Sequence, residues 1–252
     1  MKKEQHNMRV KKQHTDIDYN KTKDFFQHRA DKFQKNNPYS VTMYQDNNAE
    51  LVRERNEHEI KKLIPYLEID TAAKVLDIAC GIGRWADALS GDIAEYCGID
   101  FSPELIQIAN ERNKKENFNF YVGSALQLNT IMSENKKDHF NKVLLIGILM
   151  YLNDEDIEVL LHQVEQCCAE HATICIREPI GIEDRLTLKD FYSEELADNY
   201  NAIYRTRNEF KQFFDKNLLN KGFYIKKEGL LFNEKELNNR SETTQYYYII
   251  ER

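Results

Sequence analysis

Hydrophobic residues between positions 73 and 180 gather in short runs that alternate with amphipathic stretches. Short apolar runs are typical of buried strands, whereas apolar residues spaced three and four apart are typical of helices. This alternation predicts an α/β fold with a doubly wound, mostly parallel sheet. The five expected strands are residues 74–79, 95–100, 118–123, 141–149 and 172–179.

Two further apolar segments, residues 222–232 and 243–252, lie near the carboxyl end of the chain and could pair antiparallel. They would bring the sheet to seven strands. Between the fifth strand and these segments, residues 181 to about 220 are rich in Tyr and Arg. We expect a helical insertion there that acts as a lid.

The amino-terminal part of the chain has a different pattern. Residues 1–20 are polar enough to form a frayed tail. Helical spacing in residues 24–34 and 48–67 predicts a helical cap over residues 21–70. The sheet domain, with its lid, then occupies residues 71–252.

Composition and charge narrow the class of protein. The net charge of −7 disfavours a nucleic-acid binder. The five cysteines form no CxxC pair and indicate reduced thiols, and no spacing of His, Asp and Glu predicts a metal site. No segment approaches transmembrane length, and no apolar run follows the first charges. We therefore expect a cytoplasmic protein that binds neither membrane nor nucleic acid.

The stretch VLDIACGIGRWA, residues 75–86, follows the first expected strand and fits two kinds of cofactor. It satisfies the G-x-G-x-x-A pattern of dinucleotide-binding loops, and Asp100 ends the next strand, where it could bind a ribose. However, Asp77 would project toward the crevice and repel a pyrophosphate. The same carboxylate would attract the sulfonium and ammonium groups of S-adenosylmethionine, so the charge favours that cofactor.

At this point the sequence resembles the class I S-adenosylmethionine-dependent methyltransferases, with a Rossmann-like sheet. The resemblance spans residues 74–179 and rests on four segments in order: VLDIACGIGRW, GIDFSPELI, VGSALQL and IGILMYL. The resemblance implies that S-adenosylmethionine is the cofactor. It also implies that residues of these segments contact the methionine end, the ribose, the adenine and the midsection of that cofactor. They are Asp77, Ala79, Cys80, Gly81, Gly83, Asp100, Phe101, Ser102, Ser124, Ala125, Leu126 and Ile146.

Three residues depart from the family pattern. Ala79 replaces the usual first glycine, which is tolerable if its φ stays negative. Ser124 stands where many relatives carry an acid for the adenine amino group, so that contact should be weaker or made by backbone. Asn141 replaces an acid at the start of the fourth strand.

The segment MYQDNNAELVRERNEHE, residues 43–59, resembles the entrance helix of methyltransferases from surface-polysaccharide and small-metabolite pathways. In those proteins a Tyr and an Arg reach the cofactor carboxylate. The resemblance implies Tyr44 and Arg55 for these roles, with Arg53 as the competing choice. The alternative is that both arginines are solvated helix charges.

Two residues at strand ends are candidates for catalysis on the acceptor. Tyr151 follows the fourth strand and Glu178 ends the fifth, at the edge where open α/β sheets bind ligands. Tyr151 could instead pack against the sheet, and Glu178 could be a salt-bridged strand end. His139 and His171 each border a strand, where a surface position is the more common outcome.

The insertion and its surroundings carry the candidates for acceptor binding. Guanidinium groups near a closing lid are suited to bind phosphate or carboxylate groups, so we expect the acceptor to be an anionic sugar or metabolite. The resemblance to surface-polysaccharide and small-metabolite methyltransferases implies that the methylated atom is an oxygen. The candidate residues are Arg177, Tyr192, Arg205, Arg207 and Arg240. Alternatively, the arginines pair with acidic residues of the lid.

Two other classes of protein remain as rivals. A dinucleotide-dependent oxidoreductase is disfavoured by Asp77 and by the order of the four segments. A non-catalytic cofactor-binding subunit is the second rival, because a methyltransferase fold alone does not ensure turnover. In such a protein, side chains such as Met150 and Tyr151 would fill the acceptor pocket.

Overall fold

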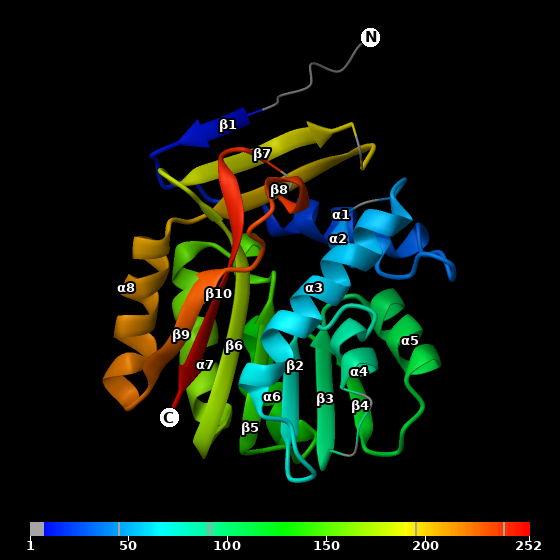
Figure 1. Cartoon of the computed structure of the whole chain (residues 1–252), viewed down its shortest axis with the longest axis vertical. Coiled ribbons are helices and arrows are strands. Elements are labelled where there is room, and N and C mark those ends of the chain that lie inside the picture. Colours follow the sequence, from blue (N-terminus) through cyan, green and yellow to red (C-terminus); the bar gives the residue numbers. More distant parts are fainter. Residues whose placement is uncertain (1–7, 45, 90, 92, 195, 239) are drawn as a thin grey trace.

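The computed structural model describes residues 8–44, 46–89, 91, 93–194, 196–238 and 240–252. A seven-stranded sheet runs through this part of the chain in the order β4-β3-β2-β5-β6-β10-β9 (Figure 1). Neighbours from β4 to β6 pair parallel, and β10 pairs antiparallel with β6 and β9. The strands are β2 (Lys74–Ile78), β3 (Glu95–Asp100), β4 (Phe118–Val122), β5 (Phe140–Ile146), β6 (Cys168–Gly181), β9 (Tyr224–Leu230) and β10 (Thr243–Glu251). The predicted doubly wound, mostly parallel, seven-stranded sheet is confirmed.

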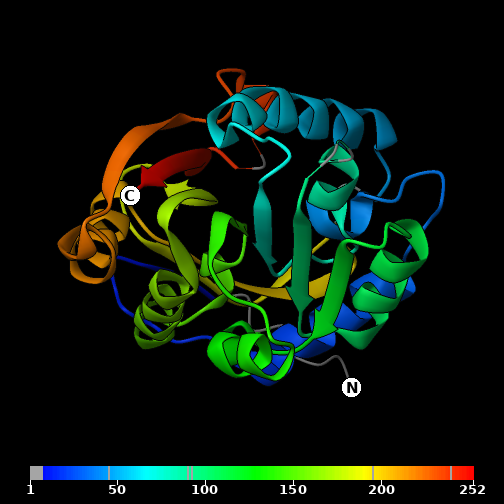
Figure 2. The same ribbon diagram turned by 90° about the horizontal axis from the view of Figure 1, so that it is seen from below.

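Side chains that alternate along the strands enter two separate cores, one on each face of the sheet. Leu76 of β2 packs in one cluster with α6 (Leu128–Glu134), α7 (Asp154–Cys167) and α8 (Arg207–Asn217). Its neighbour Val75 packs in the other with α3 (Ala49–Leu67), α4 (Arg84–Ala88) and α5 (Pro103–Arg112). Figure 2 shows α3, in blue to cyan, on the opposite side of the sheet from the green α7. The carboxyl ends of the parallel strands lie between these layers, at the edge where open α/β sheets bind ligands.

A second, smaller sheet lies above the carboxyl ends of the parallel strands in Figure 1. It has the order β1-β7-β8 and is formed by β1 (Met8–Lys11), β7 (Leu186–Ser193) and β8 (Asp198–Tyr204). The helices α1 (Tyr19–Asp31) and α2 (Ser40–Met43) lie beside it.

The expected helical lid is therefore wrong in its secondary structure, because β7 and β8 form an antiparallel hairpin. Alternate residues such as Leu186 and Leu188, or Ala202 and Tyr204, are buried together in the period of two that a strand requires. In the insertion, α8 is the one α-helix among the described residues, and Phe210 and Phe214 bury it against the main sheet. The expected frayed tail also differs, since β1 pairs with β7 and Ile17 is buried.

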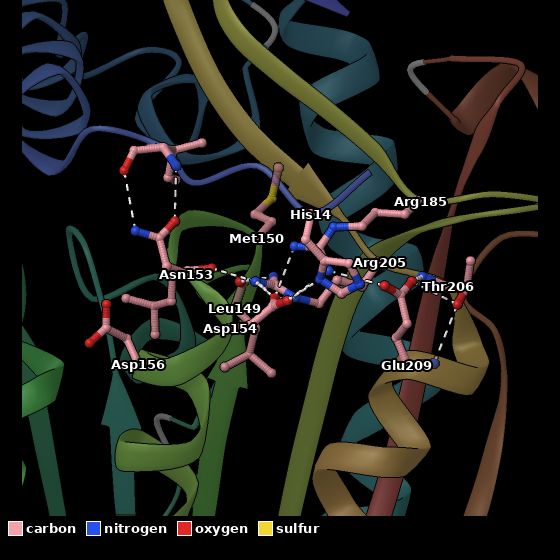
Figure 3. A network of polar contacts seen from close by, with 12 residues as sticks. His14, Leu149, Met150, Asn153, Asp154, Asp156, Arg185, Arg205, Thr206 and Glu209 are labelled. Atoms are coloured by element: carbon pink, nitrogen blue, oxygen red, sulfur yellow. Dashed lines mark hydrogen bonds and ion pairs between the residues drawn. The ribbon is translucent and has the colours of Figure 1, made fainter. Parts of the chain in front are cut away.

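A partly buried ion-pair network around Asp154 fastens the small sheet to the main domain (Figure 3). Arg205, fully buried at the end of β8, donates from Nε to Asp154 Oδ1 at 2.7 Å. Its two Nη atoms donate to the carbonyl oxygens of Leu149 at 2.9 Å and Leu152 at 2.7 Å. Arg185 and His14 also reach the Asp154 carboxylate. Burial alone would raise the pKa of Asp154, but Arg185 and Arg205 hold it well below its usual range.

Arg205 therefore has a structural role, which corrects its assignment as an acceptor-binding residue. Replacing it by Met should lower the free energy of unfolding by about 3 kcal/mol, because Asp154 and two backbone oxygens would lose a buried partner. Urea denaturation measures this change.

Arg207→Gln is the matched control, because the Arg207 side chain is 49% exposed and pairs with Glu228 at the surface. Its free energy of unfolding should change by about 0.5 kcal/mol or less. Equal stability of the Arg205→Met variant and the wild type would contradict the structural role.

Candidate active site

The loop after β2 folds back through three residues with left-handed backbone conformations. These are Ala79, Gly81 and Gly83, with φ values of +62°, +55° and +76°. A Cβ atom on Gly81 would lie 2.9 Å from Thr42 Cγ2, and one on Gly83 would lie 2.7 Å from Asn113 Nδ2. Glycine at both positions thus permits the turn and the close approach of neighbouring elements.

The expectation of a negative φ at Ala79 is wrong. The left-handed conformation costs a residue with a Cβ atom roughly 1–2 kcal/mol. A hydrogen bond from Cys80 N to Ile99 O, at 2.9 Å, holds the next peptide in place. The loop therefore keeps the shape of a glycine turn and stores strain at its first residue.

Asp100, at the end of β3, fastens this loop to the neighbouring strand. Its carboxylate accepts hydrogen bonds from Gly81 N and Ser102 N, both at 2.9 Å. Burial raises the pKa of Asp100 to about 6, against the lowering effect of these backbone amides. At neutral pH the group is therefore mostly ionised and can accept hydrogen bonds from a ligand hydroxyl as well.

A cavity of about 400 Å³ opens above the glycine loop and the ends of β3 and β5. Most of the residues predicted to bind a cofactor line it, together with Tyr151. They are Tyr44, Ala79, Gly81, Asp100, Phe101, Ser124, Ala125, Leu126 and Ile146. Sequence reasoning missed the side of the cavity formed by α1, with Tyr19, Thr22, Lys23 and Phe26.

Five other predicted residues do not line this cavity, namely Arg55, which is described below, and four residues of the loop and strand ends. Asp77 is buried below the loop and accepts a hydrogen bond from the Tyr96 hydroxyl instead of projecting into the crevice. Burial raises its pKa to about 7, so its charge is a weak basis for choosing a cofactor. Cys80 packs toward Gly98. Gly83 and Ser102 occupy the N-cap positions of α4 and α5.

A second, smaller cavity of about 80 Å³ adjoins the first. The two share four lining residues, namely Thr42, Tyr44, Ile146 and Gly147. The smaller cavity is more polar than the first and lies near the ends of β6, β8 and β10. Its polar lining residues include Arg55, Glu59, Arg177, Tyr200, Tyr204, Asn238, Thr243, Thr244 and Gln245.

The helix α3 sends Arg55 and Glu59 into this cavity, because residues four apart lie on one helix face. The Arg53 side chain is 68% exposed and lies near Glu50 and Glu57 on the outer face. Of the two competing arginines, the structure thus brings Arg55 to the cavities.

Glu59 is buried between two arginines. It forms ion pairs with Arg84 at the start of α4 and with Arg177 of β6, the latter at 2.9 Å from Nε to Oε2. Burial alone would raise the pKa of Glu59, but the two guanidinium charges outweigh it and the pKa is lowered. Gly147, with φ of +76°, makes room for Arg177, since a Cβ there would lie 3.1 Å from Arg177 Nη1. Arg177 therefore stands beside the boundary between the cavities.

Tyrosine hydroxyls also line the two cavities. The Tyr151 hydroxyl donates to that of Tyr44 at 2.8 Å, and the hydroxyls of Tyr200 and Tyr204 lie 2.6 Å apart. Burial raises the pKa of Tyr44 to about 12 and that of Tyr151 well above its ordinary value. These side chains are therefore neutral hydrogen-bonding groups at physiological pH.

The remaining predicted residues lie outside both cavities. Glu178 is fully buried and accepts hydrogen bonds from Leu149 N at 2.8 Å and Met150 N at 3.2 Å, so it supports the turn after β5. Arg240 lies over the Phe191 ring, at 5.1 Å from its centroid, and Tyr192 is on β7. Of the five candidate acceptor-binding residues, Arg177 alone lines a cavity.

Within the described ranges, no group of three or more His, Cys, Asp or Glu side chains could hold a metal ion. Among the same residues, no helix has the length and apolar character needed to cross a membrane.

Comparison with known proteins identifies the domain. Residues 75–171 match the family model described as a methyltransferase domain. A demethylmenaquinone methyltransferase of Staphylococcus aureus is 33% identical over 72 residues, which are 27% of this chain and 30% of that protein. The chain thus matches less than a third of the length of the curated relatives.

Two solved structures resemble nearly the whole chain. Haemonchus contortus phosphoethanolamine N-methyltransferase 1 superposes with a TM-score of 0.67 and 18% identity, covering 90% of this chain and 48% of that one. An S-adenosylmethionine-dependent methyltransferase of Leishmania major gives a TM-score of 0.60 at 13% identity, covering 90% and 83%. The fold is that of the class I S-adenosylmethionine-dependent methyltransferases. More particularly, the chain contains a methyltransferase domain that includes its glycine loop, covered by an amino-terminal helical cap and a small three-stranded sheet.

The strained alanine of the loop can be tested by substitution. Ala79→Gly should raise the free energy of unfolding by about 1 kcal/mol, because glycine adopts a positive φ without strain. Ala86→Gly, in the helix α4, should lower it by about 1 kcal/mol. Thermal unfolding of both variants measures the difference, and equal destabilisation by the two glycines would contradict the strain.

Proposed function

We propose that this protein transfers the methyl group of S-adenosylmethionine to a small, polar, anionic sugar or metabolite, at an oxygen atom. The observation that carries the proposal is the pair of adjoining cavities. The larger cavity has Asp100 at a strand end beside the glycine turn, and the smaller cavity is lined by Arg55 and Arg177. They meet at Ile146 and Gly147. In-line methyl transfer needs this arrangement of donor and acceptor with water excluded.

The larger cavity suits the cofactor in size and chemistry. Asp100 would accept hydrogen bonds from the ribose hydroxyls, and Phe101 with Ser124 to Leu126 would surround the adenine. The sulfonium would then lie near Ile146, with the methionine carboxylate directed toward Arg55. Bound in this way, S-adenosylmethionine supplies a methyl group already activated by the positive sulfur.

The smaller cavity supports an anionic acceptor. With Arg55 assigned to the cofactor, Arg177 lines this cavity and Arg84 pairs with Glu59, which is the one carboxylate among its described lining residues. The local charge is therefore positive. A small polar cavity is a poor site for the large apolar acceptor named in the demethylmenaquinone methyltransferase. The phosphoethanolamine bound by the Haemonchus contortus protein is closer in size and charge.

A non-catalytic cofactor-binding subunit is the second candidate. It would be favoured by an acceptor pocket plugged with side chains. Met150 lines the smaller cavity and Tyr151 the larger, and both cavities stay open. This observation favours catalysis over the scaffold.

The amino-terminal helices and the hairpin cover the proposed site. Phe26 of α1 lines the larger cavity, and Tyr200 and Tyr204 of β8 line the smaller one. We propose that these elements move apart to admit ligands and close to exclude water. S-adenosylhomocysteine should then slow trypsin cleavage in residues 8–44 and 186–204, and equal cleavage rates with and without it would contradict closure.

Calorimetric titration with S-adenosylmethionine and S-adenosylhomocysteine tests the cofactor. Both should bind the wild type, and Asp100→Asn should weaken binding about 10- to 100-fold, because charge-assisted hydrogen bonds to the ribose would be lost. Asp184→Asn, which removes a carboxylate paired with Lys12 at the surface, is the matched control. Binding of a nicotinamide dinucleotide in place of either ligand would overturn the proposal.

A further inference from the structure

We propose that the nucleophile is a carboxylate oxygen of the acceptor itself, so that the product is a methyl ester and no side chain acts as base. This inference rests on the proposed function and narrows its acceptor class. It follows from the groups that face the smaller cavity, from their partners and from the position of Arg177.

No described residue lining the smaller cavity is a histidine, and its one carboxylate, Glu59, is engaged. Glu59 pairs with Arg84 and Arg177 in a buried site. Accepting a proton would neutralise Glu59 and leave two buried guanidinium groups without their counter-ion, which is unfavourable. The nearby carboxylates of Glu178 and Asp154 are likewise held, by backbone amides and by arginines.

The tyrosines of the two cavities are equally unsuited to take a proton. Tyr44 accepts a hydrogen bond from Tyr151, and Tyr200 is paired with Tyr204. All four lie in an aromatic cluster with Phe25, and burial raises the pKa of each hydroxyl, even with Arg29 beside Tyr44 and Arg240 beside Tyr204. An alcohol, which must lose a proton as it attacks, would therefore find no acceptor for that proton among these groups.

A carboxylate needs no such group, because it is already ionised at neutral pH. Arg177 is placed to hold it. The guanidinium is fixed by Glu59 at Nε and lies near Gln245, at 3.4 Å from Nη1 to Oε1. It also lies against Gly147, which lines both cavities. A carboxylate bound there through one oxygen would have its second oxygen at the boundary where the methyl group arrives.

The transfer balances without a proton. A lone pair of the carboxylate oxygen forms the new O–C bond, the S–C bond breaks, and its electron pair stays on sulfur. An anion and a sulfonium cation become a neutral ester and a neutral thioether. Because charge disappears in this step, a cavity that excludes water favours it more than bulk solvent does.

The test uses tritium-labelled S-adenosylmethionine, with label in the methyl group, and a panel of small acceptors. The panel contains hydroxy acids, amino acids and dicarboxylic acids of two to six carbons, with sugar phosphates and primary amines of similar size. We expect transfer to a carboxylic acid, release of the label as volatile methanol in mild alkali, and no proton released per turnover in an indicator assay.

Alkali-stable label on a hydroxyl, phosphate or amine would overturn the carboxylate inference and leave the proposed function standing. No transfer to any carboxylic acid overturns the inference too. Calorimetry with S-adenosylhomocysteine on the same samples then tells whether the cofactor site, and with it the proposed function, also fails.

Arg177→Lys provides a second measurement, since it keeps the charge beside Glu59 and removes the planar guanidinium. With the carboxylic acid that reacts, kcat/KM should fall about 10- to 100-fold, mainly through KM, while S-adenosylhomocysteine binding stays unchanged. Arg207→Gln is the control and should match the wild type. An unchanged KM in Arg177→Lys would contradict carboxylate binding by Arg177.

Discussion

The buried carboxylate of Glu59, shared by Arg84 and Arg177, joins three parts of the molecule that are far apart in the sequence. Glu59 belongs to the cap helix α3, Arg84 follows the glycine loop, and Arg177 lies within the strand β6. Burying these charges is costly, and two guanidinium partners offset that cost for one carboxylate. Removing either arginine would leave a charge with less compensation, so the three positions depend on one another.

The position of α3 has direct consequences for the site. Arg55 lies one helical turn before Glu59 and therefore faces the same cavity. The contact that fixes the helix thus also presents a guanidinium group to ligands. On the other side of the site, the Asp154 network holds the small sheet, and with it Tyr200 and Tyr204, against the end of β5. Two ionic clusters therefore set the shape of the cavities.

The central sheet could be predicted from the sequence because its signal is local. Apolar runs such as KVLDIA and ATICIREP are strands in the structure, and the strand ends locate Asp100 and Ile146 at the edge where the cavity opens. Ser102 and Pro103 begin α5 as the helix-start pattern indicates. These features depend on residues within a few positions of one another.

The rest depends on distant partners, which one sequence does not show. The guanidinium group of Arg205 could bind an anionic ligand, so the sequence suggested that role. In the structure it pairs instead with the Asp154 carboxylate, 51 positions away in the sequence. From the sequence, Asp77 is expected to face the crevice. In the structure its carboxylate accepts a hydrogen bond from the Tyr96 hydroxyl instead. Tyr and Arg are compatible with helix and strand alike, so their pattern did not reveal that β7 and β8 pair as a hairpin. The spacing of Arg55 and Glu59 puts both residues on one helix face, and this was the one signal in the sequence that Glu59 could belong to the site. The spacing does not show whether that face is buried or solvated.

A crystal structure with S-adenosylhomocysteine would test the central claim most directly, namely that two adjoining cavities hold donor and acceptor. The account predicts adenine between Phe101 and the segment from Ser124 to Leu126, ribose hydroxyls on Asp100, and the sulfur at Ile146 and Gly147, facing the smaller cavity. A ligand bound elsewhere, or with its sulfur turned away from Arg177 and Tyr204, would contradict it.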